Sequence, residues 1–130
     1  MDATEKKAEE EVKRLKRVKK NCSEAIGDGM DLLWSSNGKY LWFSRKSRFC
    51  PQYITESDLK DMKDIKNKLE IREKLLDDCH LNIERDPKKD KLKETQIRVQ
   101  KLQKKTFDLI KLCGQLIDRL DQIIPQNKRK

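Results

Sequence analysis

The chain has few of the residues from which active sites are usually built. Its only histidine is His80, and Ser35 and Ser36 fall in a predicted turn with no base placed beside them. The closely spaced glycines Gly27 and Gly29 follow a predicted helix and not a strand, which argues against a phosphate-binding loop. We therefore expect a protein that is not an enzyme and that needs no cofactor.

Cysteine pairs with metal-binding spacing are also missing. The four cysteines lie 28, 29 and 34 residues apart, and no two of them form a Cys-x-x-Cys motif. Cys79 and His80 are adjacent, so on a helix their side chains point about 100° apart. We expect no metal site. The thiols of Cys22, Cys79 and Cys113 are expected to act as small apolar groups on helix stripes.

Long apolar runs are absent from the sequence. No stretch of about 18 apolar residues is available to span a membrane, and residues 2–24 contain no apolar core of a secretory signal. Because the cysteine spacing does not indicate a disulfide framework either, the expected location is the cytoplasm or the nucleus, and not outside the cell.

Charged residues are abundant, at 42% of the chain, whereas apolar residues make up only 35%. This composition is typical of long helices that each bury one stripe. The net charge of +9 is uneven. Residues 55–86 carry seven Lys or Arg against ten Asp or Glu, and residues 87–130 carry thirteen against five. The acidic and basic segments are expected to lie side by side, and the basic surplus could attract an acidic protein, nucleic acid or an anionic membrane.

A first, charged helix is predicted within residues 1–26. Its apolar residues repeat with a period of seven and include Leu15, Val18 and Cys22. The sequence Gly-Asp-Gly at 27–29 is expected to break or bend this helix, because each glycine costs about 1 kcal/mol there relative to alanine.

Residues 27–54 hold six of the seven aromatic residues of the chain. Asn37-Gly38 separates two apolar runs, and Asn-Gly in that position is a strong signal for a two-residue hairpin turn. We therefore predict a small β-hairpin that packs on the helices, in which Trp34, Tyr40 and Trp42 face inward or alternate across the hairpin.

The second predicted helix begins after Thr55 and ends near Glu84. Thr55 is placed to cap the helix, and Asp58, three residues later, completes a capping box. The apolar residues of this helix repeat every seven positions, at Met62, Leu69, Leu76 and Ile83.

The third predicted helix starts at Asp86-Pro87 and stops before Pro125, and residues 125–130 form a basic tail. One of its heptad positions is occupied by Leu92, Val99, Thr106, Cys113 and Leu120. The link between the last two helices is only two or three residues long, so residues 55–124 should form an antiparallel coiled-coil hairpin. The predicted fold is mainly α, with three long helices and the small β-hairpin between the first and the second.

The heptads leave two interpretations open. In one, the helices bury all their apolar faces against one another. In the other, one apolar face remains exposed for self-association or for a partner protein. We favour a non-enzymatic interaction or scaffold subunit of a larger intracellular assembly, because the last two helices are long for so small a chain. The predicted partner-binding residues are Trp42, Phe43, Arg45, Arg48, Phe49, Tyr53, Leu102, Leu109, Leu116, Ile117 and Ile123.

The alternative function is nucleic-acid binding through the basic first and third helices and the loop that contains Trp42 and Arg45. The densest basic run of the chain supplies Lys13, Arg14, Lys16, Arg17, Lys19 and Lys20. A solvated helix face is the plainer interpretation of this run. Binding that weakens steeply with salt would distinguish the nucleic-acid function.

Overall fold

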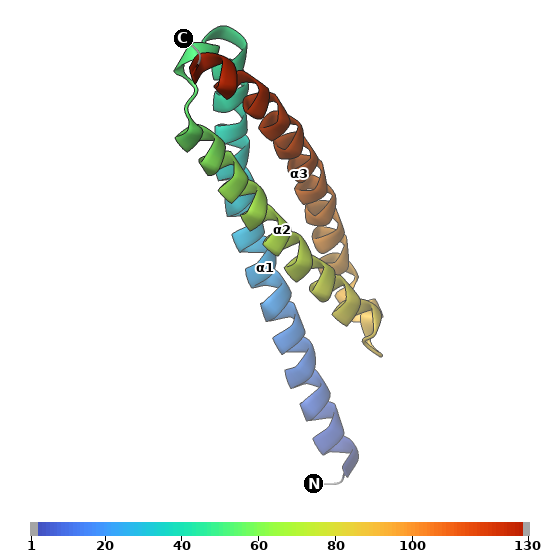
Figure 1. The fold of residues 1–130 in the computed structure, drawn as a ribbon. Coiled ribbons are helices and arrows are strands. Elements are labelled where there is room, and N and C mark those ends of the chain that lie inside the picture. Colours follow the sequence, from blue (N-terminus) through green and yellow to red (C-terminus); the bar gives the residue numbers. More distant parts are fainter. Residues whose placement is uncertain (1–2, 129–130) are drawn as a thin grey trace.

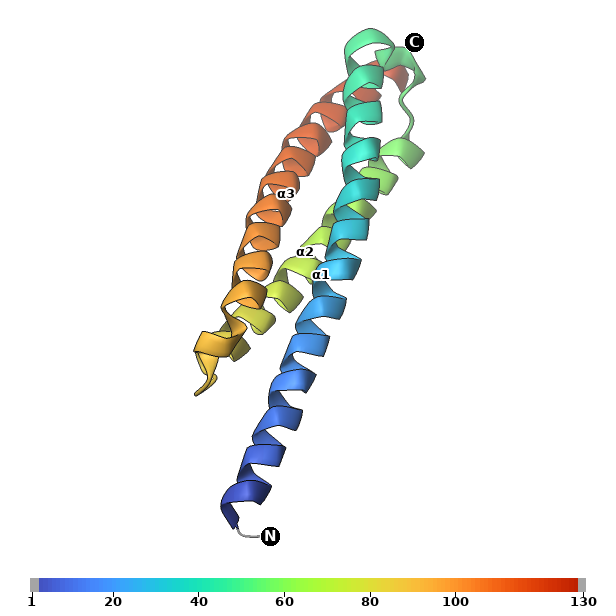
Figure 2. The same cartoon turned by 180° about the vertical axis from the view of Figure 1, so that it is seen from behind.

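The computed structural model describes residues 3–128, which form a bundle of three long helices (Figure 1). Helix α1 spans Ala3–Phe49, α2 spans Glu56–Glu84 and α3 spans Lys93–Lys128. α1 and α3 run in the same direction, and α2 runs against both. Figure 2 shows the bundle from behind, where the N-terminal part of α1 extends past the turn between α2 and α3. The predicted antiparallel pairing of the last two helices is confirmed.

One apolar core runs between the three helices. The fully buried residues include Leu92, which lies just before α3, together with Val99, Thr106, Cys113 and Leu120 of α3 and Met62, Leu69, Leu76 and Ile83 of α2. These are the residues of the predicted heptads. The polar member of this core, Thr106, donates its hydroxyl hydrogen to the carbonyl oxygen of Leu102 at 2.7 Å, which satisfies the buried group within its own helix.

The predicted β-hairpin is wrong. No strand occurs in residues 3–128, and α1 continues as one helix of 47 residues through the glycines and Asn37-Gly38. The seven-residue repeat of Leu15 and Cys22 also continues, because Gly29, Ser36 and Phe43 occupy the next positions and all are buried. Packing of this extended stripe on α2 and α3 outweighs the local preference for a turn.

Gly29 has a steric role in the middle of α1. A Cβ atom at this position would lie 2.7 Å from Cδ2 of Leu102 and 3.3 Å from Cδ of Arg72. By contrast, a Cβ atom at Gly27 or Gly38 would meet no atom within 4 Å. The absent side chain of Gly29 therefore lets α1 approach α2 and α3 closely, and the glycine expected to end the helix is a contact point of the bundle.

The start of α2 has the predicted capping box. The backbone N–H of Asp58 donates to the Thr55 hydroxyl at 3.3 Å, and the backbone N–H of Thr55 donates to the Asp58 carboxylate at 2.9 Å. The ammonium group of Lys46, near the end of α1, lies 3.0 Å from the same carboxylate. Partial burial raises the pKa of Asp58, but the Thr55 hydrogen bond and the Lys46 charge together hold it below its usual value.

The turn between α2 and α3 is longer than predicted. Asp86 does not cap α3; its carboxylate accepts the backbone N–H of Lys88 at 2.8 Å and pairs with Arg14 of α1. The short 3-10 helix η2, Lys89–Leu92, then leads into α3. The carboxylate of Asp86 therefore links the turn between α2 and α3 to α1.

The predicted end of the third helix is also wrong, because α3 continues through Pro125 to Lys128. Proline fixes φ near the helical value, but it removes one backbone hydrogen bond and its ring crowds the carbonyl of the preceding turn. Only three residues of α3 follow Pro125, so this disruption falls in the last turn of the helix. Residues 129 and 130 of the predicted basic tail lie outside the described residues. The first turn of that tail, up to Lys128, is helical.

Candidate protein-interaction surface

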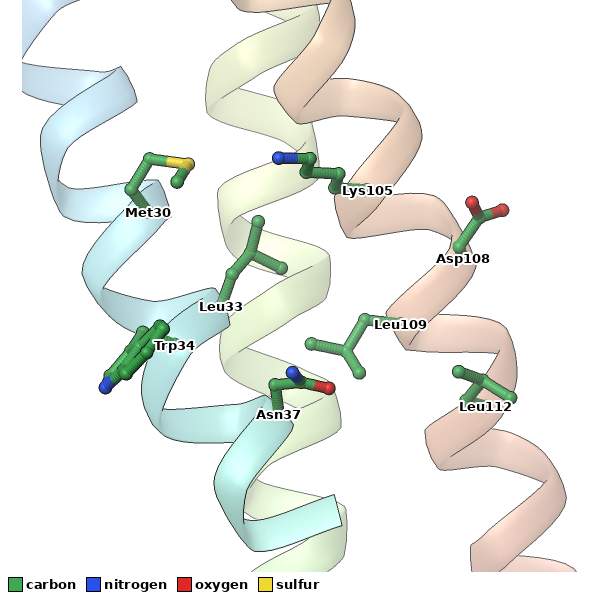
Figure 3. Close-up of a pocket in the computed structure, with 8 residues that line it drawn as sticks. All are labelled: Met30, Leu33, Trp34, Asn37, Lys105, Asp108, Leu109 and Leu112. Atoms are coloured by element: carbon green, nitrogen blue, oxygen red, sulfur yellow. The ribbon is translucent and has the colours of Figure 1, made fainter. Parts of the chain in front are cut away.

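A groove of about 360 Å³ runs along the surface between α1 and α3 (Figure 3). Its lining residues are Met30, Leu33, Trp34 and Asn37 of α1, and Lys105, Asp108, Leu109 and Leu112 of α3. In Figure 3, Leu33 and Leu109 point toward one another between the two helices, with α2 behind them. These two leucines are buried, so they form the floor of the groove while α1 and α3 form its walls.

Trp34 is the least covered large apolar residue that the structure describes, with 85% of its surface exposed. Met30 and Leu41 are also about half exposed, and they lie four residues before and seven residues after Trp34. Residues with this spacing share one face of a helix. α1 therefore shows an apolar stripe to solvent beside the groove, in addition to the stripe that it buries.

The charged groups around the groove are mostly cations. In Figure 3, Lys105 points from α3 toward α1, whereas Asp108 lies on the outer side of α3. Lys101 and Arg119 fall on the groove side of α3 by helical spacing, and Arg45 falls on the Trp34 side of α1. All of these side chains are exposed. The groove therefore has an apolar floor and a positively charged rim.

Trp42 lies at the junction of α1 and α2, away from the groove lining. Its ring packs edge-on against Phe43 with 4.7 Å between ring centroids, and the Lys46 ammonium lies 4.4 Å from the Trp42 centroid. Lys46 in turn pairs with Asp58 at the start of α2. This chain of contacts gives Trp42 a part in holding the two helices together, although half of its surface remains exposed.

The predicted partner-binding residues of the aromatic segment are divided by the structure. Phe43 is a core residue, only 2% exposed, whereas Arg45, Arg48 and Tyr53 lie on the surface. The side chain of Phe49 lies outside the described residues. Trp34, which we expected to face inward or alternate across the hairpin with Tyr40 and Trp42, is instead the most exposed ring that the structure describes; Trp42 is half exposed and Tyr40 is partly buried.

The predicted partner-binding residues of α3 are mostly covered by the chain itself. Buried in the core are Leu102, Leu109, Leu116 and Ile117, and Ile123 is partly buried. The reason is the unexpected length of α1, which packs against α3 where we expected an open face. A partner would reach these residues only if α1 moved away.

Sequence reasoning missed Met30 and Leu112 and reversed the orientation of Trp34. A signal for the exposed stripe was present, because Met30, Trp34 and Leu41 have helical spacing. It was hidden by the assignment of this segment to a β-hairpin.

The basic run of α1 faces solvent over most of its length. Exposed side chains are those of Lys13, Lys16, Arg17, Lys19 and Lys20. Arg14 is the exception, since it is partly buried, lies 3.7 Å from Glu11 and also pairs with Asp86. Arg14 therefore has a structural role, whereas the side chains of the other five cations are exposed to solvent.

The thiols lie inside the bundle for the most part. Burial raises the pKa of Cys22 to about 12, with a further contribution from Cys79, whose thiol is in hydrogen-bonding contact with it. Burial raises the pKa of Cys113 to about 11, although nearby Lys66 opposes this. Such thiols stay protonated and unreactive at neutral pH. Within residues 3–128, no group of three or more His, Cys, Asp or Glu side chains is arranged to hold a metal ion.

Known proteins offer no guide to the role of this groove. No family model, curated protein or solved structure matches the chain. Among the helices of residues 3–128, none combines the length and the apolar character needed to cross a lipid bilayer. The function is therefore inferred from the surface itself.

Proposed function

We propose that this chain is a non-enzymatic interaction subunit that joins a larger protein assembly through the groove between α1 and α3. The observation that carries the proposal is the 85% exposure of Trp34 beside a floor formed by Leu33 and Leu109. Burying a large apolar side chain stabilises a complex by about 1.5–3 kcal/mol. Tryptophan is also among the residues that most often dominate the binding energy of interfaces.

The position of Trp34 on a long helix supports the proposal. α1 is held against α2 and α3 on its other face by Gly29, Ser36 and Phe43, which are all buried. Trp34 is therefore presented by a packed element and not by a loop. A surface that is ordered before binding loses less conformational entropy when a partner docks.

A photoreactive amino acid at position 34 tests this function. We expect light to link a specific protein to position 34 in cell extract, and far less of it to position 107. Phe107 is the matched control because it is 59% exposed and lies on the opposite side of α3 from Lys105 and Leu109.

The captured protein is then purified, and its affinity is measured for both alanine variants. Trp34→Ala should weaken binding by roughly 30-fold or more, as expected for an interface anchor worth about 2 kcal/mol. Phe107→Ala should change affinity less than about twofold, as for residues outside an interface. Equal capture at the two positions, or equal affinities of the two variants, would contradict the proposed function.

Nucleic-acid binding is the second candidate, favoured by the exposed cations of α1. Lys13, Lys16 and Arg17 lie in one short stretch, and their side chains are exposed. Neutralising these three residues should weaken DNA or RNA binding and reduce its salt dependence, because fewer counterions are released. Absence of binding in low salt would end this candidate.

A further inference from the structure

We infer that the groove between α1 and α3 binds an acidic amphipathic helix of a partner protein, which lies along both helices as a fourth member of the bundle. This inference rests on the proposed function and adds the chemistry of the partner. It follows from the shape of the groove, from the charges around it, and from the surfaces that this chain itself could offer.

The shape of the groove fits a helix. Its walls are two helices that run in the same direction, and its floor is apolar (Figure 3). From Met30 through Trp34 to Leu41, the exposed stripe of α1 covers about 16 Å, or three helical turns. A partner helix with apolar residues at positions i, i+4, i+7 and i+11 presents a stripe of the same length, and such spacing is usual in helix-in-groove recognition.

The charges select an acidic helix. α1 carries twelve Lys or Arg against seven Asp or Glu, and residues 93–128 carry eight against four. α2, with six against nine, lies behind the groove and does not form its rim. On the groove side of the two basic helices, exposed cations occur at Lys19, Arg45, Lys101, Lys105 and Arg119. Asp108 is the one acidic residue in the groove lining. Opposite charge on the partner is favoured both energetically and in the rate of encounter.

A second copy of this chain is a poorer occupant. The exposed apolar residues of α2, the acidic one of the three described helices, include Ile71 at 61% and Leu75 at 43%. By helical spacing, the face around them carries the cations Lys60 and Lys68 among the anions Asp61, Asp64 and Asp78. Because its charges are mixed, this face matches the basic rim less well than a helix with acidic flanks does. The occupant is therefore expected to come from a different protein.

A nucleic acid would satisfy the cations but not the apolar surface. Phosphates and sugars would contact Lys101, Lys105 and Arg119, yet they would leave the stripe of Met30 and Leu41 in water. An amphipathic helix with acidic flanks covers both the apolar stripe and the charged rim, which is why we favour it.

The test uses the full-length protein and two dye-labelled synthetic helical peptides. Both have the same leucine stripe at positions i, i+4, i+7 and i+11; one has glutamate on both flanks, and the other has lysine. Binding is followed by fluorescence anisotropy. We expect the glutamate peptide to bind at least 10-fold more tightly than the lysine peptide, and to bind more weakly as salt is raised.

Variants locate the binding site of the glutamate peptide. Trp34→Ala and Lys105→Glu should each weaken its binding at least 10-fold, and Phe107→Ala should leave it within twofold. Circular dichroism of each variant confirms that the helices remain folded, so that loss of binding reflects the groove.

Three results of binding or sedimentation would overturn the inference, and the identity of a protein captured at position 34 can overturn it as well. One is equal binding of the two peptides, or none of the glutamate peptide. Another is tighter binding of single-stranded DNA than of the glutamate peptide, with the DNA binding lost in Trp34→Ala; this would assign the groove to nucleic acid. The last is a dimer in sedimentation that dissociates in Trp34→Ala, which would assign the groove to a second copy. If a protein is captured at position 34 but its contact segment is not an acidic helix, the proposed function stands and this inference fails.

Discussion

Replacement of Gly29 by alanine measures how closely α1 packs on the other two helices. The new Cβ atom would lie 2.7 Å from Cδ2 of Leu102, a side chain that is only 2% exposed and has little room to move. Overpacking of this kind costs about 1–3 kcal/mol. Alanine in place of glycine gains about 1 kcal/mol in helix propensity. We therefore expect Gly29→Ala to lower the free energy of unfolding by about 0–2 kcal/mol, the difference of those two effects.

Two matched variants of the same helix separate the steric effect from the propensity effect. A Cβ atom at Gly27 or at Gly38 meets no atom within 4 Å, and both residues are exposed. Gly27→Ala and Gly38→Ala should therefore each raise the free energy of unfolding by about 0.4–1 kcal/mol. Urea unfolding followed by far-ultraviolet circular dichroism gives all three values on one scale.

Two outcomes would be incompatible with a continuous α1 that packs closely at Gly29. If Gly29→Ala stabilises the protein as much as Gly27→Ala does, then α1 is not in close contact with Leu102 at this point. If Gly38→Ala destabilises the protein strongly, then Asn37-Gly38 forms a turn that requires positive φ, and α1 is not continuous.

The core, the exposed tryptophan, the helix cap and the thiols can each be tested by one substitution or labelling experiment. Phe43→Ala should lower the free energy of unfolding by about 3–5 kcal/mol because it leaves a cavity in the core. Trp34→Ala should change the free energy of unfolding by less than about 0.5 kcal/mol, because Trp34 makes few contacts within the chain; urea unfolding measures both. Thr55→Ala should cost about 1 kcal/mol through loss of the helix cap, and Thr55→Ser, which keeps the hydroxyl, should restore most of it. At pH 8, Cys22 and Cys113 should resist alkylation in the folded protein and react once it is unfolded, as measured by mass spectrometry; rapid labelling without denaturant would contradict their burial. The raised pKa values of about 12 and about 11 also predict that the contribution of these thiols to stability is complete below the ordinary thiol pKa of 9.0. It should be lost as pH rises from there through the folded-state values, because the unfolded thiols ionise first; an unfolding midpoint that does not fall between pH 9 and pH 11 would contradict this.

The hairpin of α2 and α3 was predictable because its buried positions are nearly all large and apolar. Met62, Leu69 and Leu76 mark one helix, and Leu92 and Val99 mark the other. In such a sequence the seven-residue period is unmistakable, and local propensity agrees with tertiary packing. The capping box of α2 was equally visible, because its two residues lie three positions apart.

α1 was not predictable in the same way, because two of its buried positions are occupied by small residues. Gly29 and Ser36 interrupt the apolar repeat between Cys22 and Phe43, although both are buried. Each favours a turn when judged locally, and Asn37-Gly38 reinforces that impression. Small side chains are needed at these positions because α2 and α3 pack closely against α1 there. The contacting residues lie far away in the sequence, so a local pattern does not reveal them.

The error in α1 carried over to the predicted interaction surface. A hairpin places alternate residues on opposite faces, whereas a helix groups residues three or four positions apart. Once residues 27–49 are helical, Phe43 turns into the core and Trp34 turns outward. The conclusion that aromatic residues supply the contact surface is retained as a proposal, but the ring that anchors it is a different one.

The emission of Trp34 shows whether this ring is exposed in the free protein and covered when an acidic helix binds. Trp42→Phe leaves Trp34 as the only tryptophan of the chain, and acrylamide quenching then reports how much water reaches this one ring. We predict that the free folded protein is quenched nearly as efficiently as a free tryptophan derivative, and that the glutamate-flanked peptide protects the ring and shifts its emission to shorter wavelength. A blue-shifted and protected Trp34 in the free protein, or an exposed one that no acidic helix protects, would contradict the account.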